Sequence, residues 1–109
     1  MAIKANLIID QGSDYTTTIN VTDDDDNIVD LTYYTGVAHM RKHYTSIKYY
    51  TFNVTTNAYG EVTLSMSSNT TDCIPAGRYV YDCELTDTET GSKSRLVEGI
   101  VTVTPQVTR

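Results

Sequence analysis

With 109 residues the chain is long enough for one hydrophobic core, and we predict a single domain over residues 1–109. Its hydrophobic content of 39% suits a globular protein, and no apolar run approaches the roughly 20 residues of a membrane-spanning helix, so we expect no membrane contact. The net charge of −6 disfavours nucleic-acid binding, because that binding depends on basic side chains that neutralise phosphates.

Branched and aromatic side chains recur along the chain at the two-residue period of a β-strand. Threonine alone occurs nineteen times, and valine, isoleucine and tyrosine are plentiful, which suits pleated, half-buried surfaces. Only residues 67–72 have the composition of a short helical turn. In chain order we expect strands at residues 2–9, 15–22, 28–32, 36–44, 49–55 and 61–67, another that starts near residue 77, and a last strand through residues 97–103.

Seven or eight short strands at this spacing predict an all-β fold, an antiparallel sandwich or barrel. The order of residues 76–81, a small residue and Gly77 followed by alternating large ones, is typical of a sandwich strand that enters from a corner. We expect the Tyr79 hydroxyl at this corner to bond the backbone of the loop that holds Pro75; the alternative is a half-exposed strand tyrosine. Gly99 in the last strand predicts a bulge.

Two groups of residues have the side-chain chemistry of metal ligands but not the spacing. The four aspartates at 23–26 are consecutive, whereas a calcium loop alternates its ligands and ends on a glutamate, so a solvated hairpin loop is favoured over an ion site. His39 and His43 would alternate outward on one strand with Arg41 between them, which disfavours zinc. We predict no metal and no cofactor.

The two cysteines, Cys73 and Cys83, lie ten residues apart. The N-terminal residues lack the long apolar region of a secretory signal, so we expect use without export and two free thiols; a disulfide between loop and strand is the alternative. Cys83 follows Tyr79 and Tyr81 in period two, which favours a buried small hydrophobe over a thiol nucleophile. We therefore predict no enzymatic activity.

Residues 31–60 are the best candidate for a functional surface. They hold six of the nine tyrosines and three bases but no acid, whereas residues 1–30 hold seven acids and one lysine. Tyrosine and arginine are enriched at the centres of protein interfaces, and one small domain cannot bury so many tyrosines from one segment. Stacking of single-stranded nucleic acid and an ordinary tyrosine-rich surface are the alternatives. The interface candidates are Tyr33, Tyr34, Arg41, Lys42, Tyr44, Lys48, Tyr49 and Tyr50.

Several short motifs, in order, give the chain a family resemblance. They are Asn-Ile-Val-Asp-Leu-Thr at 27–32, Thr-Gly-Val-Ala-His-Met-Arg-Lys at 35–42, Gly-Glu-Val-Thr-Leu at 60–64, Gly-Arg-Tyr-Val-Tyr-Asp at 77–82 and the final valine-rich strand. With these motifs the chain resembles the small immunoglobulin-like structural proteins of tailed bacteriophages. It looks most like those of phages infecting cyanobacteria, and like the N-terminal domain of baseplate upper proteins. Where this family has a small residue or glycine after Leu31 and Thr32, the chain has two tyrosines.

The resemblance implies an immunoglobulin-like antiparallel β-sandwich and a non-enzymatic virion component, at the head, neck, tail or baseplate. Its partners would be other virion proteins, including copies of itself. We expect the tyrosine-rich segment to dock on an acidic surface of a neighbour, which the aspartates at 23–26 of another copy could supply. A surface-displayed module that recognises host glycans is the alternative function. A small hydrolase using Cys83 or His43 is a third hypothesis.

Overall fold

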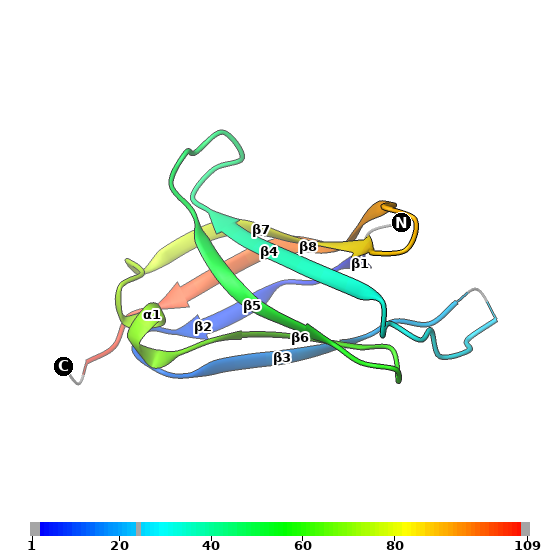
Figure 1. Cartoon of the computed structure of the whole chain (residues 1–109). Coiled ribbons are helices and arrows are strands. Elements are labelled where there is room, and N and C mark those ends of the chain that lie inside the picture. Colours follow the sequence, from blue (N-terminus) through cyan, green and yellow to red (C-terminus); the bar gives the residue numbers. More distant parts are fainter. Residues whose placement is uncertain (1–2, 24, 108–109) are drawn as a thin grey trace.

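The protein is an all-β sandwich in which strands curl around a single core (Figure 1). The computed structural model describes residues 3–23 and 25–107. In that part of the chain eight strands and one short helix form: β1 (Ile3–Lys4), β2 (Leu7–Asp10), β3 (Tyr15–Asn20), β4 (Tyr34–Arg41), β5 (Tyr50–Thr56), β6 (Glu61–Met66), α1 (Ser68–Asp72), β7 (Gly77–Asp87) and β8 (Lys93–Thr104).

The strand order is β1-β8-β7-β4-β5-β6-β3, with β2 also paired to β8. β5 belongs to both layers, because its first residues pair with β4 and its later residues pair with β6. One layer is therefore β8, β7, β4 and the start of β5, and the other is the end of β5 with β6 and β3. All these pairings are antiparallel, while β1 and β2 run parallel to β8. This arrangement confirms the predicted immunoglobulin-like sandwich.

The core consists of the apolar rows that the two-residue period predicts. β6 points Val62, Leu64 and Met66 inward, and β8 points Val97, Val101 and Val103 toward them. β4 contributes Ala38 and Met40 to the core, and β5 contributes Phe52. β7 adds Tyr79, Tyr81 and Cys83. Alternation works here because each strand has one face on the core and one toward solvent.

The prediction of a strand at residues 28–32 is wrong. Only a single bridge, between Thr22 and Ile28, forms there, and the described residues between β3 and β4 form no strand. The cause is local, since the Asp30 carboxylate accepts hydrogen bonds from the amide and the hydroxyl of Thr32 and so replaces strand pairing with a turn. Leu31 still enters the core, where it is buried.

Two strand details also differ from the prediction. The first strand is split into β1 and β2, because at Asn6 the side-chain oxygen accepts the hydrogen bond from the Ile100 amide of β8. The bulge lies between Cys83 and Glu84 of β7, not at Gly99. Gly99 instead allows a close approach, since a Cβ atom there would lie 2.2 Å from the Ala5 carbonyl oxygen. The short helical turn predicted at 67–72 is confirmed as α1.

Candidate interaction surface

The corner between α1 and β7 is built as the sequence predicts. Tyr79 is buried and its hydroxyl donates a 2.6 Å hydrogen bond to the Pro75 carbonyl. Gly77 has a φ of +144°, a region that side-chain-bearing residues rarely adopt. A Cβ atom on Gly77 would lie 2.8 Å from the Lys42 ammonium nitrogen, so the glycine also leaves room for that lysine. Gly77 therefore allows both the corner and the position of the Lys42 side chain beside it.

The loop at residues 42–49, between β4 and β5, projects from the sandwich (Figure 1). Arg41 holds it, because its guanidinium donates hydrogen bonds of 2.7 Å to the Ser46 carbonyl and 3.1 Å to the Ile47 carbonyl. The same guanidinium lies 4.6 Å from the ring centre of Tyr49, and His39 stacks on that ring at 4.2 Å. These contacts end β4 at Arg41, so the prediction that His43 shares an outward strand face with His39 is wrong.

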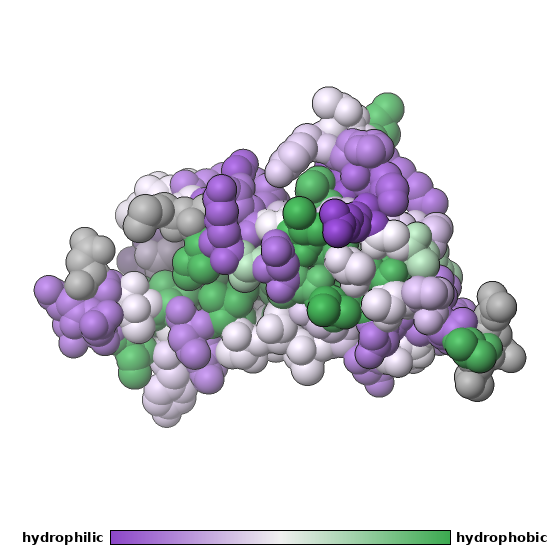
Figure 2. Space-filling view, turned by 180° about the vertical axis from the view of Figure 1, so that it is seen from behind, coloured by the Kyte–Doolittle hydropathy of each residue, from purple (hydrophilic) through white to green (hydrophobic). Residues whose placement is uncertain are grey.

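Two side chains of the held loop are directed into solvent. Tyr44 is 83% exposed and Ile47 is 93% exposed. In Figure 2 an apolar group is visible on the projecting loop at the top of the molecule. Because Arg41 holds the loop and leaves both side chains in solvent, we treat the loop as a candidate contact site.

Beside this loop lies a mostly apolar pocket of about 310 Å³. Its aromatic wall is Tyr50 and Tyr79, whose rings meet edge to face at 6.2 Å. The Lys42 ammonium lies 4.9 Å from the centre of the Tyr79 ring, and the Lys48 ammonium lies 5.5 Å from that of Tyr50. Ser46, Pro75 and Ala76 complete the lining, which contains no carboxylate.

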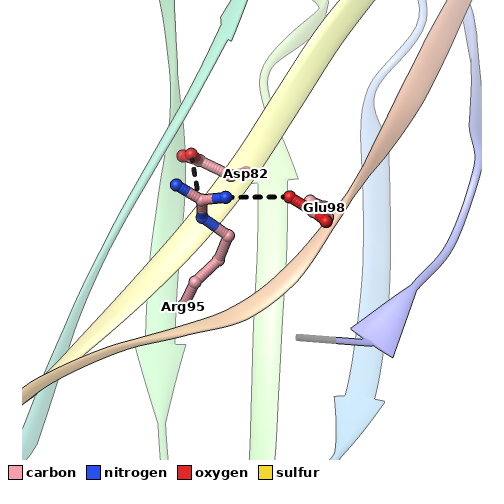
Figure 3. A network of polar contacts seen from close by, with 3 residues as sticks. All are labelled: Asp82, Arg95 and Glu98. Carbon is pink, nitrogen blue, oxygen red and sulfur yellow. Dashed lines mark hydrogen bonds and ion pairs between the residues drawn. The ribbon is translucent and has the colours of Figure 1, made fainter. Parts of the chain in front are cut away.

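A second hollow, of about 200 Å³, lies on the outer face of β4, β7 and β8. His39, Arg41 and Tyr44 line one side, and three acids line the other. Arg95 crosses this face and pairs with two of the acids, Asp82 at 3.5 Å and Glu98 at 2.9 Å (Figure 3). The third acid is Glu84. Arg41 therefore lies beside acids of the same molecule, so this part of the surface is not purely basic.

The structure brings together six of the eight predicted interface residues and separates the other two. Arg41, Lys42, Tyr44, Lys48, Tyr49 and Tyr50 surround the projecting loop. Tyr33 and Tyr34 lie at the opposite end of β4, roughly 24 Å away at about 3.4 Å per residue. Tyr33 is exposed, while Tyr34 packs partly against the core. The single tyrosine-rich segment is thus two separate regions.

The acidic loop is organised by its first aspartate. The Asp23 carboxylate accepts hydrogen bonds from the amides of Asp25 (2.9 Å) and Asn27 (3.0 Å), and Asp26 has a φ of +62°. Among residues 3–23 and 25–107, no three His, Cys, Asp or Glu side chains gather as a metal site would require. The loop also carries Ile28, which is 64% exposed. Sequence reasoning missed this exposure because it assigned Ile28 to a strand.

Neither cysteine forms a disulfide, as expected; Cys73 is exposed and Cys83 is buried. Burial, together with the neighbouring Asp82 and Glu84 carboxylates, raises the pKa of the Cys83 thiol to about 11. The thiol is therefore protonated near neutral pH and has no access to a substrate, so it lacks the properties of a nucleophile. Within the described ranges, no helix has the length and apolar content needed to span a membrane.

No family model and no curated protein matches this chain. Among solved structures, the chain is similar to InlP of Listeria monocytogenes, with a TM-score of 0.51 and 16% identity, over 94% of this chain and 28% of InlP. A family 123 glycoside hydrolase from Clostridium perfringens is more distant, with a TM-score of 0.45 and 9% identity over 97% of this chain and 24% of the hydrolase. The chain thus spans about a quarter of each. The likeness to InlP supports the fold alone.

Proposed function

We propose that this chain is an accessory structural protein of a tailed-phage virion and that it binds neighbouring virion proteins through the loop at residues 42–49. The observation that carries the binding role is the combination of a loop held by Arg41 and two side chains, Tyr44 and Ile47, left in solvent. The virion context is supported by the family resemblance of the sequence motifs.

Physical chemistry supports a role for this loop in binding. A loop that is already ordered loses little conformational entropy when a partner covers it, so more of the contact energy appears as affinity. Burial of one isoleucine side chain contributes about 1.5–3 kcal/mol, and a tyrosine adds a large rigid contact area. Tyr44 and Ile47 are therefore expected to be the energetic centre of the contact, with Lys42 and Lys48 at its rim.

The test is incorporation into particles of the phage that encodes the chain. The double variant Tyr44→Ser/Ile47→Ser changes only exposed side chains, so it should fold normally yet be depleted from purified virions by roughly tenfold or more. The matched control is Ile8→Ser/Val107→Ser, which changes two exposed apolar residues elsewhere and should incorporate like the wild type. Absence of the wild-type chain from virions, or normal incorporation of the loop variant, would refute the proposal.

A glycan-binding module is the second candidate, and one feature favours it. Tyr44 stands beside the hollow lined by Asp82, Glu84 and Glu98, and an exposed aromatic ring beside carboxylate acceptors suits a sugar, which offers apolar C–H faces and hydroxyl donors. This function requires the isolated protein to bind host envelope, and soluble saccharide should compete. The virion function requires no such binding, so the same purified protein distinguishes the two.

A further inference from the structure

The lysine-rimmed pocket described above restricts what could fill it. Its wall is the edge-to-face pair Tyr50 and Tyr79, which suits a compact apolar side chain. Its rim carries the Lys42 and Lys48 ammonium groups, and the lining offers no carboxylate. In the described residues, ion pairs involve only Arg95, so both ammonium groups remain available to an outside anion. The matching occupant is an apolar side chain flanked by carboxylates.

One segment of this chain has that character. Ile28 is 64% exposed, and the exposed acids Asp25, Asp26 and Asp30 flank it in sequence. The segment is shaped before any contact, because Asp23 accepts hydrogen bonds from the amides of two following residues. Its backbone is also tied to the residue that follows β3, since Val29 donates a hydrogen bond to the Val21 carbonyl. Ile28 is thus presented as a knob on an ordered acidic loop.

The connection between β3 and β4, which carries Ile28, lies at the opposite end of the sandwich from the turn between α1 and β7, which helps to line the pocket (Figure 1). β3 and β6 pair with Asn20 opposite Glu61 at the end that carries Ile28. At their other end Tyr15 pairs with Met66, from which α1 leads toward the pocket. The molecule is 44 Å long, so its own knob cannot reach its own pocket.

We propose that the pocket receives Ile28 from a second copy of this chain, in a head-to-tail contact steered by the aspartates of one copy and the lysines of the other. This proposal rests on the assembly function proposed above, and it identifies a second copy of the chain as one partner of the region around the loop at residues 42–49. Because the two surfaces differ, the contact is heterologous, and a joined pair of copies keeps one free knob and one free pocket. Repetition would therefore produce a ring or a row of copies.

The contact area is small, so isolated copies should associate only at high concentration, on the order of 0.1–1 mM. Sedimentation velocity and small-angle scattering of the wild type over this range should show growth beyond a dimer, and added salt should weaken it. The knob variant Ile28→Ser and the pocket variant Lys42→Glu/Lys48→Glu should each stay monomeric, with association at least about tenfold weaker. The neutral pair Lys42→Gln/Lys48→Gln serves if charge reversal disturbs the corner.

Mixing the two variants gives the decisive result. The knob variant keeps a working pocket and the pocket variant keeps a working knob, so the mixture should form dimers and nothing larger. The matched control, Lys4→Glu/Lys93→Glu, reverses two exposed lysines elsewhere and should associate like the wild type. A monomeric wild type at about 1 mM, or a mixture that stays monomeric, would overturn the contact.

The outcomes also separate this proposal from the assembly function. If the wild type is monomeric in solution and Ile28→Ser enters virions normally, the head-to-tail contact is wrong while the virion role stands. If the chain associates head to tail but is absent from virions, the virion role is wrong and the contact remains as a property of the protein.

Discussion

Replacing Tyr79 with phenylalanine tests whether one hydrogen bond stabilises the corner beside the lysine-rimmed pocket. Tyr79→Phe removes the 2.6 Å bond to the Pro75 carbonyl and keeps the ring against Tyr50 and beneath Lys42. The ring keeps its packing, and Pro75 is exposed, so water can replace the lost donor at its carbonyl. The cost is therefore that of one ordinary hydrogen bond, about 1 kcal/mol.

Urea unfolding followed by circular dichroism measures this cost. With a slope of about 1.5 kcal/mol per molar urea, the midpoint should fall by about 0.7 M and the slope should not change. Tyr44→Phe is the matched control, because the Tyr44 side chain is 83% exposed and the change should stay within about 0.5 kcal/mol. Equal midpoints for the two variants would show that the Tyr79 bond contributes no stability.

Two further predictions concern the core and the N-terminal strands. Gly99→Ala places a Cβ atom 2.2 Å from the Ala5 carbonyl oxygen, so we expect the free energy of unfolding to fall by about 1–3 kcal/mol. The Ala5 amide, which donates to the Glu98 carbonyl, should then exchange its hydrogen faster, and unchanged exchange would contradict this close approach. Burial is the main cause that raises the pKa of Cys83 to about 11 and that of Tyr81 to about 12. In the unfolded state these groups have ordinary pKa values of 9.0 and 10.0, so between pH 9 and 12 the unfolded chain releases protons that the folded protein keeps. The free energy of unfolding should therefore be highest below about pH 9 and fall as the pH rises from 9 to 12. A constant urea midpoint over that interval would contradict the raised pKa values.

The sequence by itself determined the fold class and much of the core. The alternation in residues 61–67 placed Val62, Leu64 and Met66 inward, and the order around Gly77 predicted the Tyr79 bond. These inferences succeeded because a strand's side-chain period is local and because a corner glycine and tyrosine act within a few residues of each other.

Only the tertiary structure decided the layout of the candidate surface. Residues 31–60 are one basic stretch in sequence, yet their Arg41 is engaged by its own loop and lies beside Glu84 and Glu98, which come from strands far along the chain. Exposure of Ile28 likewise depends on whether a neighbouring strand pairs with its segment. Strand pairing joins residues that are distant in sequence, so side-chain period alone cannot reveal which charges meet or which apolar residue remains uncovered.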